Sequence, residues 1–240
     1  MKKISLFIII LFFVNMAFSQ DRIPLIGEKA PSFTANSTNG KIDFPKDFGN
    51  SWKILFSHPR DFTPVCTSEV LQLAEMQKEF DALGVKIAII STDELSQHEG
   101  WKKAIEAIKL DDNKSVTINF PLIEDKNAKI SRKYGMLHEP TSTTKDVRGV
   151  FIISPDNIIE SINFYPMNVG RNMNEVVRIV EALQTAQANK VLIPVDWQKG
   201  GDVLMPYKPY TDQDLAKNPN LKNEYYNVGN DMWYKKVSDK

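Results

Sequence analysis

The alternation of short β-branched runs with segments of helical spacing constrains the fold of this chain more than any other feature of its sequence. The strand-like runs are Trp52–Ser57, Val85–Ser91, Gly149–Ser154 and Ile158–Asn163. Helical spacing of apolar residues occurs in three sets: Val70, Leu73, Ala74 and Phe80; Trp101, Ala104, Ile105 and Ile108; and Met173, Val176, Val177, Val180 and Leu183. This pattern predicts an α/β domain with a substantially parallel sheet.

A turn sequence separates the last two strand-like runs. The segment from Ser154 to Asn157 reads SPDN, and serine, proline, aspartate and asparagine all favour tight turns. It indicates a hairpin between these two strands. We therefore expect a mixed central sheet flanked by helices.

The N-terminal segment has the layout of a secretory signal peptide, with two lysines followed by an apolar stretch from Ile4 to Phe18. This stretch is shorter than the roughly 20 residues that a membrane-spanning helix needs. Because Ala17 and Ser19 are small, we expect cleavage after Ser19. Residues 1–19 are then a signal peptide, and the mature protein is exported to the periplasm or secreted. Retention of the segment as a membrane anchor is the alternative.

The charge balance gives no sign of a polyanionic partner. Lysine plus arginine and aspartate plus glutamate each number 30, so the formal net charge is zero. Binding to nucleic acid or to an anionic membrane surface normally shows as clustered basic residues. We therefore expect no nucleic-acid partner and no membrane partner.

The composition changes after about Ala188, where the chain becomes rich in proline, tyrosine and asparagine. We expect a main domain over residues 24–186 and a smaller, irregular unit over residues 187–240. The second unit contains too many aromatic residues for a disordered tail. They should pack against the main domain or against a second subunit: Trp197, Tyr207, Tyr210, Tyr225, Tyr226, Trp233 and Tyr234.

Cys66 is the only cysteine in the chain. In an exported protein, a lone cysteine is an inert buried thiol, a partner in an intermolecular disulfide, or a reactive group. Its neighbours distinguish these possibilities. The cysteine ends the run HPRDFTPVC, which starts at His58 directly after a strand-like segment.

The residues before Cys66 predict a helix start. Thr63 is a good N-cap residue and Pro64 suits the first helical position, and apolar periodicity then continues towards Phe80. Cys66 would lie in the first helical turn, where free backbone N–H groups and the helix dipole favour a thiolate. It would also lie beyond the carboxyl end of a strand, where α/β sheets bind their ligands. A small hydrophobe in the helix–sheet interface remains the alternative.

The run of residues around Cys66 resembles the active-site sequence of a known family. The spacing of Pro59, Thr63 and Cys66 is similar to the active-site signature of the peroxiredoxins, and the longer run from Phe56 to Glu69 resembles their one-cysteine subgroup. The resemblance extends from Pro31 at least to Trp197. It implies a thioredoxin-like fold followed by a C-terminal arm that forms a homodimer.

The resemblance also implies roles for individual residues. Cys66 matches the peroxidatic nucleophile, Thr63 the residue whose hydroxyl holds the peroxide and the thiolate, and Pro59 the ring that shields the thiolate from water. Arg148 matches the active-site arginine. A guanidinium suits that role because it is permanently charged and can stabilise both the thiolate and the developing oxyanion.

Three further residues match supporting positions. Glu69 matches a glutamate that supports the arginine network, and Arg171 a second arginine near the site. His58 is in register with a pocket histidine, although a purely structural histidine fits the sequence equally well.

The chemistry that this resemblance implies needs no metal and no organic cofactor. The Cys66 thiolate attacks one oxygen of a hydroperoxide, the O–O bond breaks, and the cysteine becomes a sulfenic acid. Because the chain has no second cysteine, an external thiol must reduce this sulfenic acid. Overoxidation to sulfinic acid is the expected hazard.

Four other functions fit the sequence less well. A thioredoxin-type oxidoreductase needs a Cys-x-x-Cys pair, and a cysteine hydrolase needs an oriented histidine base. The phospholipase activity of some one-cysteine relatives depends on a Gly-x-Ser-x-Gly run, whereas the stretch from Gly49 to Lys53 reads GNSWK. A scaffold that uses Cys66 as a redox sensor is distinguished from an enzyme by catalytic turnover.

Overall fold

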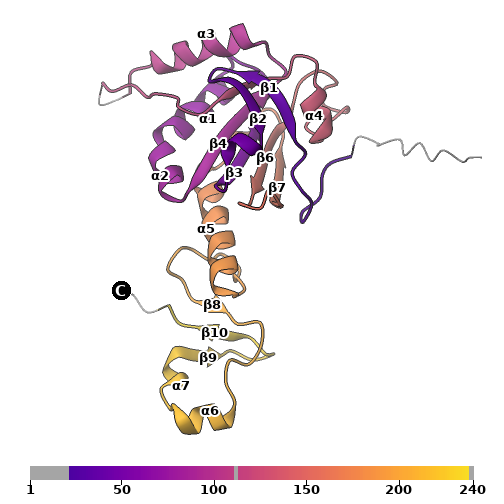
Figure 1. The fold of residues 1–240 in the computed structure, drawn as a ribbon. Coiled ribbons are helices and arrows are strands. Elements are labelled where there is room, and N and C mark those ends of the chain that lie inside the picture. The colour runs from indigo at the N-terminus through magenta and orange to yellow at the C-terminus, as the bar shows by residue number, and fades with distance from the viewer. Residues whose placement is uncertain (1–21, 111–112, 238–240) are drawn as a thin grey trace, which may run out of the picture.

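The computed structural model describes residues 22–110 and 113–237 (Figure 1). The expected signal peptide, residues 1–19, lies outside the described residues. Among the helices of the described part of the chain, none is long and apolar enough to cross a membrane.

A mixed seven-stranded sheet forms the centre of the main domain, with the strand order β2-β1-β5-β4-β3-β6-β7. The strands β3, β4 and β5 are parallel to one another, and the other pairs are antiparallel. The strand bounds are β1 Phe33–Ser37, β2 Gly40–Phe44, β3 Trp52–Ser57, β4 Val85–Ser91, β5 Leu122–Glu124, β6 Arg148–Ile153 and β7 Ile159–Tyr165. The predicted mixed sheet and its β6–β7 hairpin are confirmed.

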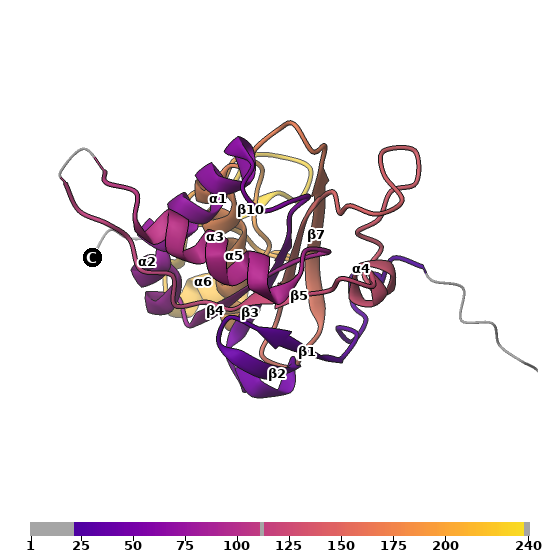
Figure 2. The same ribbon diagram turned by 90° about the horizontal axis from the view of Figure 1, so that it is seen from above.

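Helices cover both faces of this sheet, as Figure 2 shows from above, with α1, α3 and α5 on one side and α4 on the other. The helices of the main domain are η1 Lys46–Phe48, α1 Pro64–Glu75, α2 Gln77–Ala82, α3 Leu95–Glu106, α4 Lys129–Lys133 and α5 Met173–Asn189. In β3, Ile54 and Phe56 point into the core with α1, α3 and α5, and Leu55 points into the opposite core. Because both faces are buried, the centre of β3 from Ile54 to Phe56 is a continuous apolar run.

The helix expected to continue from Thr63 towards Phe80 is interrupted. The helix α1 ends at Glu75 and α2 begins at Gln77, and Met76 between them has φ −85° and ψ 1°, outside the helical region. The Gln77 side chain donates to the Ala74 carbonyl at 3.0 Å and to a second carbonyl across the fold. These two hydrogen bonds replace part of the backbone hydrogen bonding that is lost at the break. Phe80 of α2 is still buried in the same hydrophobic core as the apolar residues of α1.

The C-terminal unit is an arm that extends away from the main domain beyond α5 (Figure 1). It has a regular core, so the expectation of an irregular unit is wrong. Three strands pair in the order β8-β10-β9, and two short helices accompany them. Their bounds are β8 Val203–Leu204, α6 Asp212–Lys217, α7 Leu221–Glu224, β9 Tyr225–Asn227 and β10 Trp233–Lys235.

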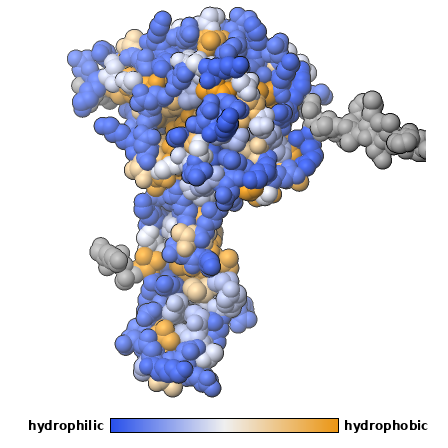
Figure 3. All heavy atoms as spheres, viewed as in Figure 1, coloured by the Kyte–Doolittle hydropathy of each residue, from blue (hydrophilic) through white to orange (hydrophobic). Residues whose placement is uncertain are grey.

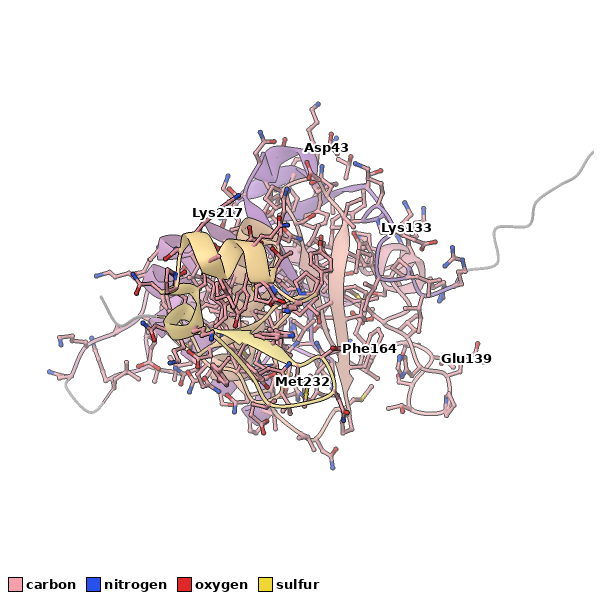
Figure 4. All side chains as sticks on the ribbon, turned by 90° about the horizontal axis from the view of Figure 1, so that it is seen from below. Asp43, Lys133, Glu139, Phe164, Lys217 and Met232 are labelled. Carbon is pink, nitrogen blue, oxygen red and sulfur yellow. The ribbon has the colours of Figure 1, made fainter. Side chains whose placement is uncertain are left out.

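The arm's aromatic residues pack mostly against one another. Tyr210 makes edge contacts with Tyr225 and Trp233, and the rings of Tyr226 and Tyr234 are stacked 5.1 Å apart. A separate buried cluster joins Trp197 and Val203 to Ala182 of α5, and Figure 3 shows apolar residues where the arm meets this helix. Figure 4 views the arm from below, with Lys217 of α6 and Met232 before β10 labelled.

The core between α1 and the sheet stabilises the helix that carries Cys66. Leu73 is fully buried there, so we expect Leu73→Ala to lower the free energy of unfolding by about 2–5 kcal/mol through lost burial and a residual cavity. Urea unfolding measures this difference. Leu25→Ala, at a position that is 57% exposed, is the control and should change the free energy by less than about 0.5 kcal/mol. Equal effects of the two substitutions would contradict this packing.

Candidate active site

Cys66 lies where the sequence predicts it, in the first turn of α1. The helix begins at Pro64, Thr63 occupies the N-cap position with extended backbone, and Cys66 is fully buried. The Thr63 side chain makes no capping hydrogen bond to the helix, and its hydroxyl donates to the Arg60 carbonyl at 2.9 Å. The N–H groups of the first turn therefore remain free of a side-chain cap next to the thiol. Such groups favour a negative charge.

A buried arginine contacts the cysteine. Arg148 is the first residue of β6 and is 1% exposed, and its Nη1 lies 3.3 Å from Cys66 Sγ. Its Nε and Nη2 both donate to the Met167 carbonyl, which holds the guanidinium plane in place. A permanent positive charge in direct contact with sulfur favours the thiolate over the thiol.

Glu69 forms ion pairs with two arginines, one of which contacts the thiol. Its Oε2 accepts from Arg148 at 2.7 Å and from Arg171 at 2.6 Å, and its Oε1 accepts from the Arg171 Nε at 2.9 Å. Burial alone would raise the pKa of Glu69, but the charges and hydrogen bonds of the two arginines hold it below its ordinary value. Two guanidiniums and one carboxylate leave one positive charge in a buried site, and a Cys66 thiolate would neutralise it.

The backbone of the sheet fixes Arg171. Its Nη1 donates to the carbonyls of Ser57 and Gly149, and its guanidinium lies 5.0 Å from the centre of the Phe56 ring. At Gly149 an added Cβ would lie only 2.9 Å from Ser57 Oγ, which itself accepts the Gly149 N–H at 2.8 Å. Glycine is therefore required for β3 and β6 to approach closely at the site.

A buried group of two histidines and an aspartate connects the loop before α1 to α3. His58 Nε2 is 2.7 Å from Asp61 Oδ1, and Asp61 Oδ2 is 2.8 Å from His98 Nδ1. The His58 ring packs at 4.9 Å on Trp101, whose indole N–H donates to Oγ1 of Thr67, the residue after Cys66. The sequence indicates a role for His58 but not for Asp61 or His98.

The polar atoms of this group take part in several hydrogen bonds. His58, Asp61 and Asp93 also present ligand-type atoms within 4.8 Å of one another, as a metal site would. However, Asp93 accepts from the Asp61 N–H and from Ser91 Oγ and pairs with Lys145 Nζ at 2.8 Å. Asp93, Asp61 Oδ1 and His58 Nε2 therefore already have protein partners, so the group fits a hydrogen-bond network better than a metal site.

Comparison with known proteins agrees with this geometry. The sequence matches the AhpC/TSA family over residues 26–162 and the C-terminal domain of 1-Cys peroxiredoxin over residues 182–219. A peroxiredoxin of Methanosarcina mazei is 49% identical over 185 residues, which cover 77% of this chain and 84% of that protein. The chain belongs to the peroxiredoxin family.

Solved structures confirm the predicted thioredoxin-like fold with a C-terminal arm for this peroxiredoxin. A cysteine-to-serine mutant of peroxiredoxin 6 from Arenicola marina matches with a TM-score of 0.79 and 31% identity over 90% of this chain and 100% of that one. A yeast mitochondrial 1-Cys peroxiredoxin matches with a TM-score of 0.76 and 34% identity over 89% of this chain and all of that one.

The structure brings most of the predicted site residues of this peroxiredoxin together. Cys66, Arg148, Glu69 and Arg171 form one connected group. Of the others, Pro59 and His58 are buried in the loop between β3 and α1, and Thr63 lies at the start of α1. His58 Nδ1 has no hydrogen-bond partner within the residues that the structure describes.

The Glu69 carboxylate, which Arg148 and Arg171 share, should contribute to the stability of the fold as well as to the charge of the site. We expect Glu69→Gln to lower the free energy of unfolding by about 3 kcal/mol at pH 7, because two buried guanidiniums lose their anion. Since the folded pKa of Glu69 lies below the ordinary 4.5, the carboxylate's contribution is complete above 4.5 and is lost as the pH falls through the folded value. Urea unfolding between pH 7 and pH 3 should show the difference shrinking on the acid side.

The matched control is Glu75→Gln, at an exposed position of the same helix. It should change the free energy of unfolding by less than about 0.5 kcal/mol at any pH in this range. If the difference in unfolding free energy between the unsubstituted protein and Glu69→Gln did not change with pH, it would contradict the conclusion that Glu69 is ionised and shared by two arginines.

Proposed function

We propose that Cys66 performs peroxide reduction in this thiol-dependent peroxidase, with Thr63, Pro59 and Arg148 as its immediate active-site partners and Glu69, Arg171 and His58 in support. The contact between Arg148 Nη1 and Cys66 Sγ at 3.3 Å is the observation that carries this proposal. It puts a fixed positive charge where the thiolate forms and where negative charge develops on the leaving oxygen.

In the first step, the Cys66 thiolate attacks the terminal oxygen of hydrogen peroxide or an organic hydroperoxide. The S–O bond forms as the O–O bond breaks, and the other oxygen leaves with the electron pair, takes a proton, and departs as water or an alcohol. Thr63 donates its hydroxyl hydrogen to Arg60, so its oxygen lone pairs are available to accept the peroxide O–H. Pro59 shields the thiolate from water.

In the second step, external thiols reduce the sulfenic acid. Two thiol molecules restore Cys66 and become one disulfide, and one water is released. The structural study of the yeast relative concerns thiol resolution through the glutathione and thioredoxin systems. We infer a reductant of the same chemical class for this chain, which has no second cysteine. The enzyme thus contributes to antioxidant defence and redox homeostasis.

One equivalent of hydrogen peroxide should add a single oxygen to Cys66, detected by mass spectrometry, and excess thiol should remove it again. Catalytic turnover with peroxide and thiol should be lost in Cys66→Ser, because a hydroxyl is not ionised near pH 7 and cannot act as this nucleophile. Retained turnover in that variant would refute the mechanism. Oxidation of Cys66 without turnover under any thiol would instead support a redox-sensing scaffold.

We also propose a homodimer formed through the arm. Several large apolar residues of the arm remain exposed in the single chain, among them Val195 at 87% and Tyr207 at 75%. Surfaces of this kind commonly mark protein interfaces. Sedimentation at micromolar concentration should give the mass of a dimer, and Val195→Asp combined with Tyr207→Ser should give a monomer. A monomer in the unsubstituted protein would contradict the proposal.

The last proposal is export. The support is the signal-like sequence of residues 1–19. In a cell that exports the protein, N-terminal sequencing of the mature chain should begin at Gln20. A chain that still carries its apolar segment and remains with the membrane fraction would favour the anchor instead.

A further inference from the structure

One buried hydroxyl binds the backbone on both sides of Arg148. Ser57 is fully buried at the last position of β3. Its Oγ donates to the Val147 carbonyl at 2.7 Å and accepts the Gly149 N–H at 2.8 Å. These directions are fixed, because a backbone carbonyl only accepts and a backbone N–H only donates. The two peptide groups that flank Arg148 are therefore both bound to the same side chain.

The hydroxyl binds at the point where the regular ladder between β3 and β6 ends. The last pair of that ladder is Phe56 with Val150. Beyond it, the Gly149 N–H also donates to the Val147 carbonyl at 3.1 Å, which is the hydrogen bond of a γ-turn centred on Arg148. A side-chain hydroxyl thus takes over from the strand ladder at the residue that carries the active-site guanidinium.

Ser57 itself is fixed to the centre of the sheet. It pairs with Ile90 of β4 in a parallel ladder, and the N–H of the next residue, His58, donates to the Ile90 carbonyl at 3.1 Å. Gly149 leaves room for the hydroxyl, since a Cβ at that position would lie only 2.9 Å from Ser57 Oγ. The hydroxyl can therefore reach both peptide groups from a rigid strand.

The backbone carbonyl of Ser57 binds the second arginine of the site. Nη1 of Arg171 donates to the carbonyls of Ser57 and Gly149, at 2.9 Å and 2.7 Å. Arg171 also pairs with Glu69, whose other partner is Arg148. The hydroxyl and the carbonyl of one residue thus bind the surroundings of both guanidiniums.

We infer that Ser57 is a positioning residue for peroxide reduction, because its hydroxyl fixes the backbone of Arg148 and so directs the guanidinium at Cys66. The Met167 carbonyl holds the far end of the same side chain through Nε and Nη2. With both ends bound, Nη1 lies 3.3 Å from Cys66 Sγ. A charge that is already aligned stabilises the developing negative charge without rearrangement during the reaction. The inference rests on the proposed function of Cys66.

Ser37 provides a matched control. It is 3% exposed at the last position of β1, and its Oγ donates to the Gly40 carbonyl at 2.7 Å and accepts the Asn39 N–H at 3.1 Å. Alanine at either serine therefore removes one donated and one accepted hydrogen bond to the backbone. Both substitutions should lower the urea midpoint of unfolding, since buried backbone groups lose a partner. Only Ser57 binds the backbone of Arg148.

The test compares the unsubstituted protein with Ser57→Ala and Ser37→Ala in two measurements on Cys66. In Ser57→Ala, the second-order rate constant for oxidation by hydrogen peroxide should fall about tenfold or more, because Arg148 is no longer held in place. The midpoint of the pH profile for alkylation by iodoacetamide should move to higher pH, because the positive charge beside the sulfur favours the thiolate less. Ser37→Ala should leave both quantities unchanged.

Ser57→Thr keeps the hydroxyl and should restore most of the rate constant and the original alkylation profile. If both quantities were unchanged in Ser57→Ala, or if a folded Ser57→Thr reacted as slowly as Ser57→Ala, the inference would be overturned. If Ser57→Ala does not fold, Ser57→Thr decides in the same way, and failure of both to fold would assign Ser57 a purely structural role. Absence of peroxide oxidation in the unsubstituted protein would instead count against the proposed function.

Discussion

The shared carboxylate of Glu69 is the interaction on which the site depends. It binds two buried guanidiniums that would otherwise repel each other, and holds one of them 3.3 Å from Cys66. Isolated buried charges are expensive, but these carry several hydrogen bonds each and are nearly neutral as a group once the thiolate is included. The chemistry of the cysteine and the stability of its surroundings therefore have the same electrostatic origin.

The fold brings the side chains of Glu69 and the two arginines together. Arg148 begins β6, Glu69 lies one turn beyond Cys66 on α1, and Arg171 immediately precedes the N-cap of α5. These elements meet because β3 pairs with β6 and because α1 and α5 pack on the same face of the sheet. The close approach of Gly149 to Ser57 brings the two strands and the Arg171 contacts into one place.

Much of this arrangement could be predicted from the sequence. The bounds of β3 and β4 were predicted correctly because both are largely apolar runs in the centre of the sheet. The hairpin β1–β2 was missed because it lies at one edge of the sheet and carries many polar residues. The strand β5 was missed because it is only three residues long. The break at Met76 was also missed, since it depends on a side-chain hydrogen bond from Gln77.

The site residues could likewise be predicted only in part from the sequence. A local motif identified Cys66, Thr63 and Pro59, and the family resemblance added Arg148, Glu69 and Arg171. Asp61 lies within the motif but gains its meaning only from His98, which is 37 positions away (98 − 61) and meets it through tertiary packing. The arm's sheet was unpredictable because its strands are two or three residues long and its aromatic residues pack on one another.

The central claim is that the Arg148 charge makes Cys66 reactive. Its most direct test is the second-order rate constant for Cys66 oxidation by hydrogen peroxide at pH 7, measured by stopped flow in the unsubstituted protein and in Arg148→Gln. We expect a rate constant at least about 100-fold lower in the variant. Equal rate constants in a folded variant would contradict it.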